Sequence, residues 1–215
     1  MTHAPSRLRL FFLLTLVSSF CAAAVAQAAP PAKATPAAKQ HSVLKVVTPG
    51  TQPAIPQVWL TKAHSKLCKV VVGEAFPEVK LPLLGGETTD LATLHGENAT
   101  VILFWHPDRW MARTALIDLE RDVVKKLATD KVAVVGIAVH QPSGAAQEQV
   151  SKSKLTFPQL LDTQGEALAK VGTFSLPRLY VLDAEGRVVW FDIEYSEGTR
   201  RELQQTLEVL AKAKP

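Results

Sequence analysis

Cysteine is scarce in this chain, and its scarcity excludes most sulfur chemistry. Only Cys21 and Cys68 occur among 215 residues. Cys21 lies in an N-terminal segment that we expect to be removed, so the mature chain would keep one thiol and could form no internal disulfide. Cys68 is then buried, paired with another molecule, or reactive, and burial in a strand over residues 67–72 is the simplest interpretation.

Motifs of several other enzyme classes are also missing. The sequence has no Gly-x-Ser-x-Gly elbow and no glycine-rich loop that would hold a phosphate, and Gly85-Gly86 is typical of a hairpin turn. His106 and His140 follow two predicted neighbouring strands. Two histidines are too few for a zinc site, because zinc takes three or four protein ligands. We therefore predict neither a metal site nor a cofactor.

The charge balance gives no indication of nucleic-acid binding. The chain has 24 Lys and Arg against 20 Asp and Glu, a formal net charge of +4. Removal of residues 1–26 takes away Arg7 and Arg9 and no acidic residue, which leaves 22 basic residues and a net charge of +2. Basic residues also do not cluster with aromatic ones, as a nucleic-acid surface would require.

The N-terminus has the pattern of an export signal. Arg7 and Arg9 precede the apolar run Leu10 to Val17, and small residues follow through Ala26. This run is too short to span a membrane, so we predict a cleaved signal peptide at 1–26, with a retained anchor as the alternative. An Ala/Pro-rich linker and N-terminal extension at 27–56 would precede a folded domain at 57–215. The mature protein would be periplasmic or extracellular, with no stable membrane span.

Hydrophobic patterning over the folded domain predicts alternating strands and helices. Two apolar runs, 100–105 and 132–139, have the length and character of strands buried on both faces. The order β-α-β-α-β-β-α favours an α/β three-layer sandwich with a central mixed sheet. The other predicted elements are helices at 113–129, 145–154, 165–171 and 197–213, a hairpin of 179–183 with 187–191, an extended segment at 77–84, and short strands at 43–47 and 57–60.

Four segments carry a resemblance to a known family. They are Val72-Gly73-Glu74-Ala75-Phe76-Pro77, Leu103-Phe104-Trp105, Thr156 to Asp162, and Phe174 to Val189. In this order and spacing, residues 72–212 resemble exported thioredoxin-like proteins. The nearest groups are the cytochrome-maturation thiol reductases and the redoxin family, also called the alkyl hydroperoxide reductase/thiol-specific antioxidant (AhpC/TSA) family. The resemblance implies a thioredoxin-like fold and a cis-proline at Pro177.

The same resemblance shows what this chain has lost. In the family, redox cysteines lie at the start of the helix that follows the strand ending near Trp105. Here those two positions are Arg109 and Ala112, and neither side chain can form a mixed disulfide. A peroxiredoxin alignment from Pro107 places Thr114 at the reactive cysteine, and a hydroxyl cannot replace a thiolate there. We therefore predict a degenerate active site with no catalytic residue.

The degenerate junction retains features suited to binding. Helix N-termini attract anions and arginine adds paired donors, so a carboxylate, a phosphate or an acidic peptide is a candidate ligand. Alternatively, these side chains point into solvent while Asp108 caps the helix. With the Pro177 loop, the junction would form a groove for an extended peptide or protein partner. The candidate binding residues are His106, Arg109, Trp110, Arg113, Pro177 and Arg178.

Three functions remain open from the sequence. The first is an exported thioredoxin-like domain that binds a peptide or partner without thiol oxidoreductase activity. The second is an enzyme, either a thiol-disulfide oxidoreductase or a peroxiredoxin-like antioxidant, that uses Cys68 together with a partner's thiol. The third is a structural module tethered by its Ala/Pro-rich linker.

Overall fold

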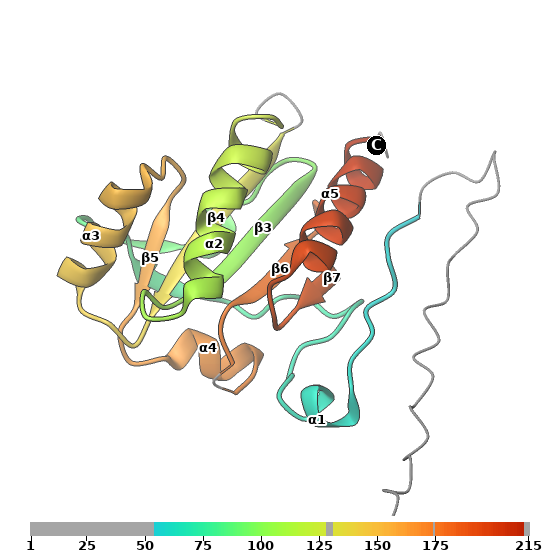
Figure 1. Cartoon of the computed structure of the whole chain (residues 1–215), viewed down its shortest axis with the longest axis horizontal. Helices are drawn as coiled ribbons and strands as arrows, with labels where there is room; N and C mark the ends of the chain where they lie inside the picture. The colour runs from blue at the N-terminus through green and yellow to red at the C-terminus, as the bar shows by residue number, and fades with distance from the viewer. Residues whose placement is uncertain (1–53, 128–130, 174, 213–215) are drawn as a thin grey trace, which may run out of the picture. The chain divides into compact units, whose positions relative to one another are not determined.

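A five-stranded mixed sheet organises the structure, a computed structural model that describes residues 54–127, 131–173 and 175–212 (Figure 1). The strand order is β5-β4-β3-β6-β7, with β3, β4 and β5 parallel and β6 and β7 antiparallel to their neighbours. All seven residues of the central strand β3 are buried, which explains why all but Thr100 are apolar. The strands are β3 (Ala99–Trp105), β4 (Val132–Val139), β5 (Gln159–Asp162), β6 (Arg178–Leu182) and β7 (Val188–Asp192).

Helices cover both faces of this sheet, giving three layers (Figure 1). Side chains from α2, α3 and α5 pack on one face, where the buried residues include Leu116, Ala146 and Leu203. The other face is covered by α4 and by segments that precede β3. The helices are α1 (Lys62–Ser65), α2 (Trp110–Leu119), continued by the π-helical turn η2 (Glu120–Val124), α3 (Ser143–Ser153), α4 (Glu166–Val171) and α5 (Glu197–Lys212).

A small hairpin precedes the main sheet. Strand β1 (Lys80–Pro82) pairs antiparallel with β2 (Thr88–Asp90), around the predicted Gly85-Gly86 turn. The short 3-10 helix η1 (Leu91–Leu94) then leads into the segment before β3, and Asp90 caps its start by accepting a hydrogen bond from the Ala92 N–H.

The fold class predicted from the sequence is confirmed, and several local predictions are corrected. Residues 57–60 form no strand, and residues 67–72 contribute only an isolated bridge between Cys68 and Gly172. Residues 159–162 form an additional strand, β5, at the edge of the sheet. Helix α2 begins at Trp110 instead of residue 113, and its regular α-helical part ends at Leu119.

Some predictions lie outside the described residues. These are the signal peptide at 1–26, the strand at 43–47 and nearly all of the linker at 27–56. Within the residues that the structure describes, no helix is both long enough and apolar enough to cross a membrane.

Candidate binding site at the strand–helix junction

The junction between β3 and α2 brings together most of the predicted binding residues. Strand β3 ends at Trp105, and Arg109 is the N-cap residue of α2 but makes no side-chain capping bond. The prediction that Asp108 caps the helix is wrong, because the Asp108 N–H instead donates to His106 Nδ1 at 3.2 Å and the Asp108 side chain stays exposed. The first N–H groups of α2 therefore have no side-chain cap and keep their positive potential.

The two positions of the lost cysteines have different surroundings. Arg109 is exposed at the helix start, whereas Ala112 is completely buried among the side chains of the α2-side core. Neither position offers sulfur or another nucleophile. That the junction carries out no thiol exchange stays a prediction from these two residues.

The outer surface of α2 exposes an apolar stripe. Trp110 is 65% exposed and Ile117 is 47% exposed, and residues seven apart lie on one face of a helix. Arg113, one turn after Trp110, is half-buried and donates from Nη1 to the Pro107 carbonyl oxygen. Arg113 therefore braces the turn before the helix instead of extending freely into solvent.

The Pro177 loop lies at the same end of the sheet. The Leu176–Pro177 peptide bond is cis, as the resemblance implied. Phe104 is paired in register with Arg178, so Pro177 lies at the end of β3 from which the chain enters the junction. The topology thus brings the buried Pro177 to His106 and the start of α2.

Arg178 does not join this cluster, which corrects the sequence-based expectation. Successive residues of a strand point to opposite faces. Leu179 belongs to the core on the α2 side, whereas Tyr180 belongs to the core on the opposite side. The Arg178 side chain is fully buried and contacts the Tyr180 hydroxyl, so it points away from α2.

The single thiol of the described chain also lies on the face opposite α2. Cys68 is half-buried, packs against the core cluster on that face, and lies 3.8 Å from Nη1 of Arg178. Its thiol also donates to the His64 carbonyl oxygen at 3.5 Å. The thiol and the junction are therefore separated by the sheet, and Cys68 does not substitute for a cysteine at position 109 or 112.

The two candidate histidines do not form a metal site. His140 packs against Gly165, where a Cβ atom would lie only 2.1 Å from its Cε1. His106 accepts the Asp108 N–H described above. Among the described residues, no group of three or more His, Cys, Asp or Glu side chains is arranged to hold a metal ion.

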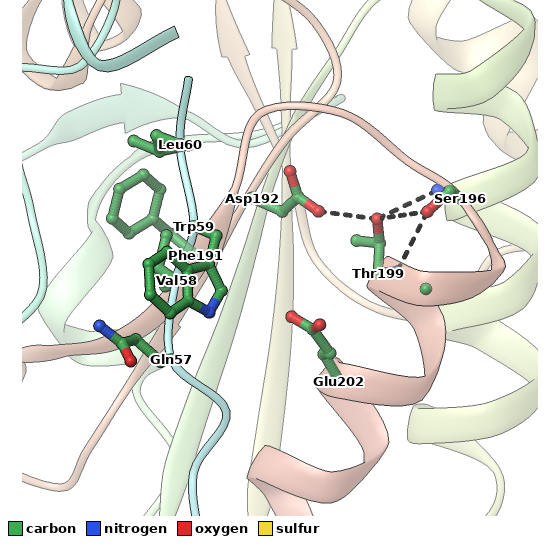
Figure 2. Close-up of a pocket in the computed structure, with 10 residues that line it drawn as sticks. Gln57, Val58, Trp59, Leu60, Phe191, Asp192, Ser196, Thr199 and Glu202 are labelled. Carbon is green, nitrogen blue, oxygen red and sulfur yellow. Dashed lines mark hydrogen bonds between the residues drawn. The ribbon is translucent and has the colours of Figure 1, made fainter. Parts of the chain in front are cut away.

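A hollow that sequence reasoning did not anticipate lies away from the junction, where residues 57–60 meet the end of β7 and the start of α5 (Figure 2). Its volume is about 180 Å³. Both of its carboxylates serve the fold: Asp192 accepts from the Thr199 hydroxyl at 2.7 Å, and Glu202 accepts from the Trp190 indole N–H at 3.3 Å. We assign this hollow a structural role in fixing the start of α5.

The fold defines a thioredoxin-like protein, and Arg109 and Ala112 occupy the two positions that the resemblance aligns with the family's redox cysteines. The AhpC/TSA family model matches residues 72–191, and the chain belongs to this family. A comparison with curated proteins finds no match.

Several of the similar solved structures are of thiol–disulfide proteins. A secreted Mycobacterium tuberculosis disulfide oxidoreductase, described as homologous to Escherichia coli DsbE, is 27% identical over 61% of this chain and 95% of its own, with a TM-score of 0.53. A putative thiol:disulfide interchange protein DsbE from Chlorobium tepidum is 17% identical over 66% and 99%, with a TM-score of 0.61. Peroxidoxin BcpB from M. tuberculosis is 18% identical over 68% and 99%, with a TM-score of 0.57.

Proposed function

We propose that this protein is an exported redoxin domain that binds an extended peptide segment of a partner and catalyses no thiol exchange at its β3–α2 junction. The observation that carries the proposal is the pair of residues at the former redox positions, an exposed Arg109 and a buried Ala112. Export is supported by the N-terminal pattern of Arg7 and Arg9 before an apolar run, and by the secreted M. tuberculosis neighbour.

The proposed binding site is the surface between the start of α2 and the Pro177 loop. Trp110 offers a large, rigid apolar surface at its edge, and exposed aromatic residues of this kind often dominate peptide binding. The uncapped N-terminus of α2 and Arg109 favour a carboxylate in the bound segment. We therefore expect a partner segment with one acidic group next to an apolar residue.

Substitution of Trp110 by Ala tests this surface. The binding probe is a peptide that is selected on the mature protein from a random display library. Trp110 is 65% exposed, so a ring of roughly 200 Å² leaves roughly 130 Å² available for burial. Covering this area of the Trp110 ring completely contributes about 3 kcal/mol to the binding free energy, and ordering the ring costs about 1 kcal/mol. The net value of about 2 kcal/mol predicts a Kd about 30-fold higher for Trp110→Ala.

Trp59 supplies a matched control for this measurement. It is 81% exposed but lies before α1, outside the junction, so Trp59→Ala should leave the Kd unchanged. Fluorescence anisotropy of the labelled peptide measures both variants. Equal affinity of Trp110→Ala and wild type would place the binding surface elsewhere.

Activity assays separate this proposal from the enzymatic alternative. With a small thiol as reductant, insulin reduction and hydroperoxide consumption by the mature protein should show no turnover above a protein-free blank that contains the same thiol. Turnover that disappears in Cys68→Ser would instead support a thiol oxidoreductase that acts through Cys68.

A further inference from the structure

A second hollow, larger than the one in Figure 2, lies at the outer edge of strand β7, and we call it the β7-edge hollow. Its volume is about 620 Å³, within the range of pockets that hold small organic ligands. Residues 55–58, residues 72–73 and the start of β7 form it, and its apolar walls are Ile55, Pro56, Val58, Val72, Val188 and Val189. Val188 is completely buried and Val72 is 48% exposed, so the hollow extends from the core to solvent.

The β7-edge hollow lies at the opposite end of the sheet from the β3–α2 junction. Val188 pairs with Leu182, and Leu182 pairs with Thr100. Thr100 lies near the start of β3, whereas the junction follows the other end of this strand at Trp105. A ligand in the hollow therefore does not compete with a peptide at the junction, and failure of either proposal leaves the other standing.

Hydrogen bonds from neighbouring elements hold the walls of the hollow in place. The Gly73 N–H donates to the Val188 carbonyl oxygen at 2.7 Å, and the Val188 N–H donates to the Glu74 carbonyl oxygen at 2.9 Å. From α5, Gln205 Nε2 donates to the Ala54 carbonyl oxygen at 2.7 Å and anchors the segment that leads into residues 55–58. A Cβ atom on Gly73 would meet no other atom within 4 Å, so the space beside this residue is open.

One cation lines the β7-edge hollow. Arg187 is half-buried, and its guanidinium makes one long hydrogen bond, from Nη1 to the Gly73 carbonyl oxygen at 3.5 Å. Among the described residues it forms no ion pair. The other charged residue of the lining is Asp183, whose Oδ1 accepts from the backbone N–H groups of Glu185 and Arg187 at 3.1 and 2.8 Å. The Arg187 guanidinium therefore keeps N–H donors for a carboxylate, whereas Asp183 serves the hairpin turn.

We propose that the β7-edge hollow binds the anion of a free medium-chain fatty acid, with its alkyl chain against the apolar walls and its carboxylate on Arg187. An alkyl chain suits these walls because aliphatic contact stabilises it without any hydrogen-bonding partner. A carboxylate suits Arg187 because a guanidinium binds it with two parallel N–H···O hydrogen bonds. A peptide suits the hollow less well, because its backbone N–H and C=O groups would lose water against aliphatic side chains.

Isothermal titration calorimetry of the mature protein with decanoate tests this proposal, at pH 7.5 and below the micellar concentration. We expect saturable 1:1 binding with a Kd on the order of 0.1 mM. Hexanoate, whose chain is four methylenes shorter, should bind about tenfold more weakly because it covers less of the apolar wall. Decyltrimethylammonium, which has the same alkyl chain as a cation, should also bind about tenfold more weakly, since Arg187 repels its headgroup.

Two matched pairs of variants locate the bound decanoate. Arg187→Gln should raise its Kd about fivefold, whereas Arg201→Gln, which removes an exposed arginine of α5, should leave the Kd unchanged. Val72→Gln should raise the Kd about fivefold because it makes one wall polar. Val71→Gln is its control, since Val71 is 44% exposed but does not line the hollow. Circular dichroism checks that each variant is folded.

Four results would overturn the proposal. The first is no saturable binding of decanoate, and the second is equal affinity for decanoate and decyltrimethylammonium. The third is unchanged binding in folded Arg187→Gln and Val72→Gln, which would place the fatty acid elsewhere. The fourth is a dimer in sedimentation velocity that Val72→Gln abolishes and decanoate does not dissociate, which would assign the hollow to a second copy of the chain. If a variant does not fold, the three ligands compared on wild type still decide.

Discussion

Asp122 links the helix that carries the junction to the C-terminal helix, and its replacement by Asn should destabilise the protein measurably. The carboxylate is buried in η2 and accepts hydrogen bonds from three cations. Arg121 donates at 3.1 and 2.8 Å, Lys126 at 2.8 Å, and Arg200 of α5 at 2.8 Å. Asp122→Asn keeps the shape of the side chain and removes the charge that all three share.

The size of the expected loss in unfolding free energy follows from how exposed Asp122 and its three partners are. Breaking a fully buried ion pair costs about 3 to 5 kcal/mol, whereas an exposed pair contributes about 0.2 to 1 kcal/mol. Here the carboxylate is 3% exposed but its three partners are 38 to 60% exposed, so they regain water after the substitution. We expect the free energy of unfolding to fall by about 2 kcal/mol at pH 7.

Acidic pH provides an internal check on this value. The hydrogen bonds from Arg121, followed by those from Lys126 and Arg200, hold the pKa of Asp122 well below its usual range. A carboxyl group with a lowered pKa stabilises the fold above its unfolded pKa, about 3.9, and loses that contribution as the pH falls toward its folded pKa. The difference in unfolding free energy between wild type and Asp122→Asn should therefore be constant from pH 7 to 5 and shrink below about pH 4.

Urea unfolding followed by far-UV circular dichroism measures the unfolding free energies of wild type and Asp122→Asn at each pH. Equal m-values show that both proteins unfold in the same transition. Asp108→Asn is the matched control, because the Asp108 side chain is 86% exposed and should leave the stability unchanged. Equal stability of Asp122→Asn and wild type at pH 7 would refute the reasoning. A difference that stays constant down to pH 2 would refute its electrostatic part.

Two further predictions concern the two faces of the sheet. The double variant Arg109→Cys with Ala112→Cys should have insulin-reductase activity, because a thiol at a helix N-terminus ionises readily. The two single variants are the controls. A correctly folded double variant without activity would show that the junction lacks more than the two cysteines. Gly172→Ala should lower the unfolding free energy by about 1 to 3 kcal/mol, since its Cβ would lie 2.6 Å from Arg178 Nη1. Urea unfolding measures this change in the unfolding free energy. If Gly172→Ala were as stable as wild type, the packing around Gly172 would not be tight.

The fold could be predicted from the sequence because its central strands are buried on both faces. Residues 99–105 and 132–139 are apolar apart from Thr100, and their length and composition are typical of strands that are covered on both faces. Strand β5 was missed because it has four residues and begins with the polar Gln159. That side chain is buried over Gly136 and accepts the Trp105 indole N–H at 3.0 Å, a partnership between distant parts of the chain.

The candidate site was predicted in part, and its errors have separate causes. His106, Arg109 and Trp110 lie between the end of β3 and the first turn of α2, where the clear end of the strand led us to expect them, and their role in binding stays a prediction. Arg178 was misplaced because its neighbourhood was inferred from Pro177, the residue beside it in the sequence. Alternation along β6 would have shown the error, since Leu179 faces α2 and Arg178 must then face away. By contrast, the contact between Arg178 and Cys68 joins residues 110 positions apart, and no local pattern predicts it.

The pleat of β6 also explains how two neighbouring residues, Pro177 and Arg178, reach opposite faces of the sheet. Pro177 ends the loop that borders the junction, and the next residue, Arg178, directs its side chain through to the opposite face. The backbone between them is fixed by the pairing of Arg178 with Phe104. Cys68 lies beside the buried Arg178 side chain, on the face of the sheet opposite α2.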